Sequence, residues 1–244
     1  MNPNSVPDIR LGYNQVREKI DLAARRAGRQ PESVRLVVVT KTHPLETIRM
    51  VLEAGIRDLG ENYVEEAEEK ILAVGTVSKL TWHMIGHIQS RKAEAVARNF
   101  EFVHSLDSLK LANRLDRFAG EAGRKLAVLL ECNVSGETSK FGFSAFEQGQ
   151  WEILSEQASR IAQLPNLEIR GLMTMPPLEL NAEKARLFFR KMCELQAFLS
   201  RKNQQSNWSE LSMGTSSDFE AAVEEGATLV RVGTAILGSR PAHQ

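Results

Sequence analysis

The chain has 244 residues, of which 42% are hydrophobic and 25% are charged, a composition typical of a globular protein with an apolar core. Its 31 basic residues equal its 31 acidic residues in number, so no basic surplus indicates binding to nucleic acid or to an anionic membrane. Two cysteines are too few for a disulfide framework, and no apolar run is long enough to cross a bilayer. Because the first residues lack the pattern of a signal peptide, we expect a cytoplasmic protein.

Strand-like and helix-like segments alternate along the chain. A leading helix carries Val16, Ile20, Ala23 and Ala27 on one apolar stripe. Eight predicted strands follow, at 34–40, 58–61, 81–88, 102–106, 126–133, 167–175, 210–214 and 229–233. Such alternation implies a parallel sheet with crossover helices, and eight units in this length favour a closed barrel over an open doubly wound sheet. We therefore predict an α/β fold, a single (β/α)8 TIM barrel with an extra N-terminal helix, that occupies residues 1–244 as one domain.

Local signals predict several helix boundaries. Pro44 suits the first position of a helix, and Gly55 suits the position just past its end. The pattern of a capping box, a serine followed three residues later by a glutamate, occurs at 144–147 and again at 217–220. We expect a helix to begin at each of these two places.

The distinctive residues of the sequence follow the predicted strands, where the active site of a parallel barrel lies. Lys41 comes directly after the first strand, where partial desolvation would lower the pKa of its amine and favour attack on a carbonyl to form a Schiff base. The loops after strands seven and eight, which often bind phosphate in such barrels, carry glycines, hydroxyl residues and the fixed positive charge of Arg231. A reactive lysine beside a phosphate site indicates pyridoxal 5′-phosphate, although an aldolase that uses Lys41 on a sugar phosphate fits the same residues.

Nine stretches spread over the chain carry a family resemblance. They are TKT at 40–42, GENYV at 60–64, WHMIGHIQS at 82–90, VHSLDS at 103–108, NVSGETSKFG at 133–142, RGLMTM at 170–175, LSMG at 211–214, DFEAA at 218–222 and VRVGT at 230–234. Through them the chain resembles the pyridoxal phosphate homeostasis protein family, also called the proline synthetase co-transcribed homolog family. The resemblance implies a barrel of the alanine racemase type that binds pyridoxal 5′-phosphate and maintains vitamin B6 pools, and through them amino-acid and 2-oxo-acid balance.

The resemblance also implies a set of cofactor-binding residues: Lys41, Asn62, Met173, Ser212, Gly214, Arg231, Gly233 and Thr234. In the family pattern Lys41 holds the cofactor as a Schiff base and Arg231 faces its pyridine nitrogen. Asn62 approaches the ring or its 3-hydroxyl, Met173 forms an apolar wall, and the other four residues hold the phosphate. Thr215 departs from the pattern, because the family often has methionine there.

An arginine at the pyridine nitrogen argues against strong catalysis. The guanidinium of Arg231 can only donate hydrogen bonds, so it keeps that nitrogen unprotonated and weakens the ring as an electron sink. Alanine racemases carry a second, β-rich domain and a catalytic tyrosine from the partner subunit, whereas this sequence ends soon after the last predicted strand and contains only Tyr13 and Tyr63. We therefore expect a monomeric carrier or regulator of the cofactor, not an enzyme, with apo forms of pyridoxal phosphate enzymes as candidate partners. A weak amino-acid racemase and a protein-interaction module are the alternatives.

Three histidines receive structural interpretations. His83 and His87, four residues apart on a predicted strand, would point to the same side, but no third ligand for a metal ion is evident. We expect His104 and Asp107 to orient a turn. The sequence therefore predicts no metal site.

Lys140 and the charge run at 65–70 are charged features outside the predicted cofactor-binding set. Lys140 follows the fifth predicted strand, and we expect it to line the entrance of the site and to aid transfer of the cofactor. The charge run at 65–70 is expected to be a solvated helix face.

Overall fold

A computed structural model describes residues 5–177 and 181–239 of the chain, and it contains a closed barrel of eight parallel strands. The barrel strands are β1 (Arg35–Val39), β2 (Asp58–Glu61), β3 (Thr81–Met84), β4 (Phe102–Leu106), β5 (Leu126–Asn133), β7 (Leu167–Met173), β8 (Glu210–Ser212) and β9 (Leu229–Val232). They follow each other around the barrel in the order β4-β3-β2-β1-β9-β8-β7-β5, and pairing of β4 with β5 closes the ring. The predicted (β/α)8 barrel is confirmed.

Every predicted strand is present, but several end earlier than expected. The strands predicted at 81–88, 167–175, 210–214 and 229–233 stop at Met84, Met173, Ser212 and Val232, where the backbone leaves the ladder to form the loops of the carboxyl rim. One further short strand, β6 (Phe143–Ser144), was not predicted; it pairs with the end of β5.

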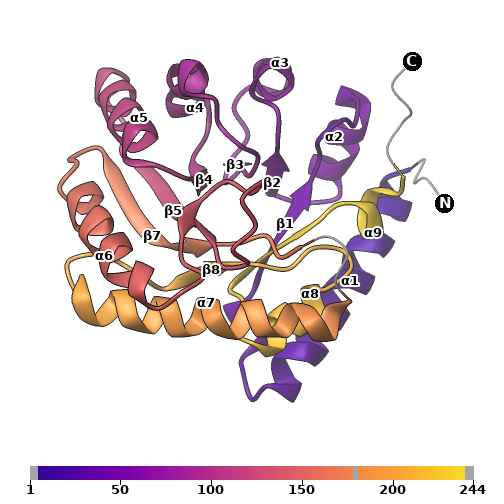
Figure 1. Cartoon of the computed structure of the whole chain (residues 1–244). Helices are drawn as coiled ribbons and strands as arrows, with labels where there is room; N and C mark the ends of the chain where they lie inside the picture. The colour runs from indigo at the N-terminus through magenta and orange to yellow at the C-terminus, as the bar shows by residue number, and fades with distance from the viewer. Residues whose placement is uncertain (1–4, 178–180, 240–244) are drawn as a thin grey trace.

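Helices surround the barrel (Figure 1). They are α1 (Val6–Arg26), α2 (Leu45–Glu53), α3 (Val64–Val74), α4 (Ala93–Asn99), α5 (Leu109–Glu121), α6 (Gly149–Ala162), α7 (Ala182–Lys202), α8 (Phe219–Glu224) and α9 (Thr234–Leu237), with the 3-10 turns η1 (Pro31–Ser33) and η2 (Ser90–Lys92). The extra N-terminal helix α1 packs against α2, α8 and α9, and so joins the first and last units of the barrel. Among the described residues, no helix combines the length and the apolar character that a membrane crossing requires.

The helix-boundary signals gave mixed results. Pro44 is the N-cap of α2 and not its first residue, while Gly55 follows the helix with φ of 91°, as expected for a glycine past a helix end. Both predicted capping boxes are wrong. Ser144 is held in the ladder to β5, so α6 begins only at Gly149, and α8 begins at Phe219 without a side-chain cap.

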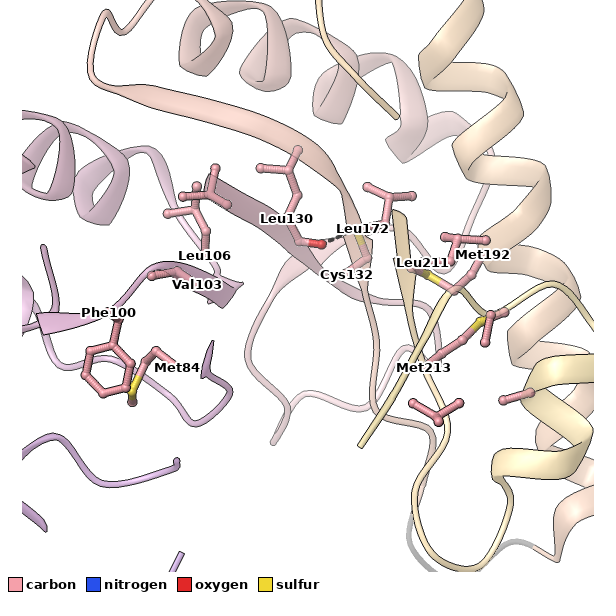
Figure 2. Close-up of a cluster of buried hydrophobic side chains, with 14 of the residues drawn as sticks. Met84, Phe100, Val103, Leu106, Leu130, Cys132, Leu172, Met192, Leu211 and Met213 are labelled. Atoms are coloured by element: carbon pink, nitrogen blue, oxygen red, sulfur yellow. Dashed lines mark hydrogen bonds between the residues drawn. The ribbon is translucent and has the colours of Figure 1, made fainter. Parts of the chain in front are cut away.

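The main core lies between the barrel and the helices. Val16, Ile20 and Ala23 bury the predicted stripe of α1, whereas Ala27 lies past the helix end and is exposed. Figure 2 shows side chains of this layer from β3, β4, β5, β7 and β8, with Met192 contributed by α7. Burying an aliphatic or aromatic side chain of this size contributes roughly 1.5–3 kcal/mol, so this layer supplies the main driving force for folding.

A smaller apolar cluster fills part of the barrel interior. Its buried members come from five strands and are Val37, Phe102, Leu129, Met173 and Leu229. Polar side chains occupy the rest of the interior, among them the fully buried rings of two histidines. Because a TIM barrel is a packed core and not a pore, the space for a ligand lies above these layers, at the carboxyl rim.

Candidate functional site

A cavity of about 290 Å³ lies at the carboxyl ends of the barrel strands. Five of the eight predicted cofactor-binding residues line it: Lys41, Asn62, Arg231, Gly233 and Thr234. They come from the ends of β1, β2 and β9, which are neighbours in the barrel. The structure therefore brings together residues that lie up to 193 positions apart in the sequence.

The other three predicted residues lie behind this cavity and not among those that line it. Met173 belongs to the apolar cluster inside the barrel, and Ser212 is fully buried. Gly214 has φ of 93°, and a Cβ atom on it would come within 2.6 Å of the Cβ of Ala222. Glycine at 214 is therefore required by the turn and by the close approach of α8.

Sequence reasoning left six lining residues outside its predicted set: Val39, Ile85, Met175, Thr215, Ser216 and Ser217. Met175 is the clearest omission, because it lies two positions beyond Met173 and therefore on the same side of an extended strand, one layer nearer the rim. Met175 therefore forms an apolar part of the cavity wall, with Met173 one layer deeper inside the barrel.

The turn that carries Lys41 is fixed by buried ionic groups behind it. Thr40 donates its hydroxyl to Glu61 Oε1 at 2.6 Å, and the backbone amide of Thr42 donates to Glu66 Oε1 at 2.6 Å. Thr42 has φ of 63°, which a β-branched residue rarely adopts. Lys41, half-buried between these two threonines, is thus held at the cavity wall by its neighbours on both sides.

Arg231 places a buried positive charge at the cavity. Its guanidinium is 3% exposed; Nη1 donates to the hydroxyl of Ser212, and Nη2 donates to the carbonyl oxygen of Thr174 at 3.0 Å. Burial lowers the pKa of Arg231 to about 10, against the opposing attraction of Asp218 and Glu131. The group therefore remains a cation and a hydrogen-bond donor at neutral pH.

Backbone amides gather where the loops after β8 and β9 meet the cavity. No hydrogen bond within the described residues engages the amides of Ser216, Ser217 and Thr234. The Asp218 carboxylate accepts hydrogen bonds from the amide and the hydroxyl of Thr215, at 2.6 and 3.0 Å, so the threonine hydroxyl is used within its own loop. Three unengaged amides and the hydroxyl of Thr234, all on residues that line the cavity, are donors of the kind that can bind an anion.

Asn62 presents an unused acceptor to the same cavity. Its side-chain Oδ1 is buried and has no hydrogen-bond partner within the described residues. A buried polar atom without a partner costs free energy, so such an atom in a cavity wall indicates a ligand that donates to it. A ring hydroxyl fits this requirement.

Lys140 and Glu131 lie at the mouth of the barrel. Lys140 donates to the carbonyl oxygen of Met175 at 2.7 Å and pairs with Glu137 at 3.5 Å; burial lowers its pKa. Glu131 has a buried Oε2 atom without a partner among the described groups, and burial, reinforced by Asp107, raises its pKa to about 7. Both residues are therefore close to the cavity, although neither lines it.

The histidine interpretations need correction. His83 lies on β3, but His87 lies beyond the end of that strand, where its ring stacks on Phe141 with 3.6 Å between centroids and its Nδ1 is 3.2 Å from Asp107 Oδ2. The two histidines do not form a pair, and the described residues contain no metal-binding cluster. His104 orients no turn: it lies within β4, buried against His83 at 2.9 Å.

Comparisons with known proteins show the family of the chain. The family model "Alanine racemase, N-terminal domain" matches residues 12–241. The pyridoxal phosphate homeostasis protein of Escherichia coli K12 is 41% identical over 235 residues, which is 96% of this chain and 97% of the relative. The chain belongs to the pyridoxal phosphate homeostasis protein family. Its relative of that name in Pseudomonas aeruginosa is 43% identical over 93% of each chain.

Solved structures extend the comparison. PipY of Synechococcus elongatus, solved with pyridoxal phosphate bound, is 38% identical with a TM-score of 0.78, over 91% of this chain and 100% of PipY. Alanine racemase of Clostridium difficile is 16% identical with a TM-score of 0.70, over 97% of this chain and 58% of the racemase. This second likeness shows that the barrel of the homeostasis proteins has the alanine racemase fold.

Proposed function

We propose that the protein binds pyridoxal 5′-phosphate in the cavity beside Lys41 and serves vitamin B6 homeostasis in the cytoplasm, and through it amino-acid and 2-oxo-acid balance. The observation that carries the proposal is the composition of one cavity wall, where a lysine, a buried arginine, an unpartnered amide oxygen and three unengaged backbone amides meet. An aldehyde, a pyridine nitrogen, a ring hydroxyl and a phosphate supply the complementary groups. A PipY structure with the cofactor bound supports the same ligand.

The polar lining residues divide the groups of the cofactor among them in this proposal. Lys41 would hold the cofactor through its aldehyde, as a Schiff base. Arg231 would donate to the ring nitrogen, and the Oδ1 of Asn62 would accept from the ring hydroxyl. The loops at 215–217 and 233–234 would hold the phosphate, where Thr234 adds a hydroxyl and Gly233 lets the backbone approach. The cavity wall is supported from behind by Met173, Ser212 and Gly214, which do not line the cavity.

Storage or delivery of the cofactor fits the site better than catalysis. Bound pyridoxal phosphate supplies an electron sink for reactions of amino acids. Arg231, which can only donate, leaves the ring nitrogen unprotonated and weakens that sink. Neither tyrosine lines the cavity: Tyr13 packs in α1, and Tyr63 is the exposed N-cap of α3. We therefore propose a monomeric carrier or regulator that supplies apo forms of pyridoxal phosphate enzymes.

One observation favours the second candidate, a weak amino-acid racemase. Glu131 lies at the barrel mouth with a pKa of about 7, which suits a group that takes up and releases a proton near neutral pH. Loss of optical rotation from L-alanine, caused by the purified protein with cofactor and abolished in Glu131→Gln, would establish this activity. Unchanged rotation favours the carrier.

The visible absorption spectrum tests the proposed function. Wild-type protein mixed with pyridoxal 5′-phosphate should develop the yellow band of a Schiff base, Lys41→Ala should not, and the control Lys125→Ala, at an exposed lysine away from the cavity, should match wild type. Absence of the band from wild-type protein would contradict the proposal and favour the sugar-phosphate aldolase.

A further inference from the structure

A chain of hydrogen bonds crosses the barrel interior from the cavity to the opposite face. Arg231 Nη1 donates to the hydroxyl of Ser212, whose oxygen lies 2.8 Å from His104 Nδ1. His104 Nε2 lies 2.9 Å from His83 Nδ1, and His83 Nε2 lies 3.0 Å from Asp58 Oδ1. The chain therefore joins β9, β8, β4, β3 and β2. Asp58 is the first residue of β2, at the amino end of the barrel, and is the partly exposed terminus of the chain.

The two ends of the chain and the neutral form of both rings together set the direction of every bond between them. The Asp58 carboxylate only accepts, so His83 must carry a proton on Nε2. If His83 is neutral, its Nδ1 is an acceptor and His104 must donate from Nε2. If His104 is also neutral, its Nδ1 accepts the hydroxyl proton of Ser212. The serine oxygen then presents its lone pairs to Arg231, so all four hydrogen bonds point from Arg231 toward Asp58.

The surroundings of the two rings favour the neutral form of both. His83 and His104 are fully buried, and the ring of Phe102 packs against both, with centroids 5.5 and 4.9 Å away. Burial lowers the pKa of His83, although Asp58 opposes the shift. Burial, together with the charge of Arg231, holds the pKa of His104 well below its usual range. Arg35 also disfavours a positive charge on either ring, and Glu101 is the remaining opposing charge near His83.

We infer that this directional chain orients Arg231 for cofactor binding, which makes Asp58, His83, His104 and Ser212 positioning residues for a site that none of them lines. In this state the Ser212 hydroxyl donates to His104 and accepts from Arg231, so the serine that receives the guanidinium is held on its other side by the histidine pair, which is anchored on Asp58. The inference rests on the proposed function for its role in cofactor binding. The hydrogen-bond direction itself stands independently of any ligand.

Nitrogen-15 NMR of the imidazole rings in ligand-free wild-type protein tests the direction. We expect His83 and His104 both to be neutral with the proton on Nε2 at pH 7. A charged His83, or a proton on Nδ1 of His104, would reverse the bond to Ser212 and overturn the inference. Because no cofactor is present, this result does not depend on the proposed function.

Cofactor titration of variants tests the effect on the cavity. Removal of a residue that only orients a metal ligand typically weakens metal binding about tenfold or more. We expect an effect of the same size here, so Asp58→Ala should weaken binding of pyridoxal 5′-phosphate about tenfold or more. Asp58→Asn should restore most of the affinity, because the amide oxygen still accepts from His83. Asp21 and Asp58 line the same pocket at the amino end of the barrel. Asp21→Ala is therefore the matched control, because Asp21 pairs with Arg17 and not with a histidine.

The results of these experiments distinguish the positioning role of the hydrogen-bond chain from the proposed binding of the cofactor. Wild-type affinity in Asp58→Ala, or equal losses in Asp58→Ala and Asp21→Ala, would overturn the inference that the chain orients Arg231. No binding by wild-type protein would contradict the proposed function, while the NMR result would still decide the direction of the chain.

Discussion

The ammonium group of Lys70 lies 2.8 Å from the carbonyl oxygen of Thr40, the residue that precedes Lys41. The same nitrogen lies 2.8 Å from Glu61 Oε1 and 2.6 Å from Glu66 Oε1, so all three ammonium protons have acceptors. Lys70 is 5% exposed and Glu61 is fully buried. This buried ionic cluster connects β2 and α3 to the turn that presents Lys41.

Removal of the Lys70 charge should destabilise the protein severely. Lys70→Met leaves Glu61 buried without its cation, and breaking a buried ion pair on one side costs about 3–5 kcal/mol. Denaturant unfolding monitored by fluorescence measures the loss. Lys202→Met, which removes an exposed lysine paired with Glu152, is the control and should change stability by less than about 1 kcal/mol. A loss of similar size in both variants would contradict the account of the cluster.

The left-handed conformation of Thr42 should store strain. Its φ of 63° is unfavourable for a β-branched residue, and its buried hydroxyl oxygen has no partner within the described residues. Thr42→Gly should therefore raise the free energy of unfolding by about 1 kcal/mol, as measured by denaturant unfolding. The exposed Lys79, with φ of 62°, is the control: Lys79→Gly should give a smaller gain, because lysine is not β-branched and has no buried polar atom. Destabilisation by Thr42→Gly would show that the threonine is held without strain.

The burial of Glu131 should make stability fall as pH rises. Its folded pKa is raised from 4.5 to about 7, so the contribution of its protonated form is present below pH 4.5 and is lost as pH rises through 7. Glu131→Gln should therefore unfold with a free energy about 1–3 kcal/mol higher than wild type at pH 8.5, and the difference should vanish near pH 4. Titrating groups that do not interact with Glu131 are common to both proteins and cancel in this comparison. A difference that does not change with pH would contradict the raised pKa.

Lys140 should affect the transfer of the cofactor more than its equilibrium binding. Its ammonium holds the backbone of Met175, which lines the cavity. We expect Lys140→Ala to bind pyridoxal 5′-phosphate with nearly wild-type affinity but to release it more slowly to an apo enzyme, as followed by recovery of that enzyme's activity. The exposed Lys125 provides the control variant. A normal transfer rate in Lys140→Ala would contradict this role.

The sequence was sufficient to predict the barrel, because eight apolar strand segments alternate with helices at the spacing that a parallel barrel requires. It was also sufficient to predict that Lys41, Asn62 and Arg231 meet, since the ends of β1, β2 and β9 lie on one rim whatever the exact register.

The level at which a strand residue lies along the barrel axis could not be predicted in the same way. Met173 and Ser212 pair directly across β7 and β8, one layer below the cavity, and this level depends on strand register. A one-layer difference exchanges a wall residue for an interior residue, as with Met173 and Met175. The contact between His83 and His104 also depends on register, because β3 and β4 pair with His83 opposite Phe102, two residues before His104.

The charge run at 65–70 shows a different limit of sequence reasoning. Glu65 and Glu69 are exposed, as expected, but the side chain of Lys70 turns inward to Glu61. A local charge pattern gives no sign of the carboxylate that a preceding strand has already buried. The interpretation of the whole run as a solvated face was therefore wrong at Lys70 and at Glu66, which pairs with it.

Chemical trapping identifies the lysine that holds the cofactor. Wild-type protein saturated with pyridoxal 5′-phosphate is reduced with borohydride, digested and analysed by peptide mass spectrometry, so that the reduced cofactor marks the lysine that held it. We expect the label on Lys41 in stoichiometric yield, with none on Lys140 or Lys70. A label on another lysine, or no label on a protein that binds the cofactor, would contradict the assignment of Lys41 as the anchor.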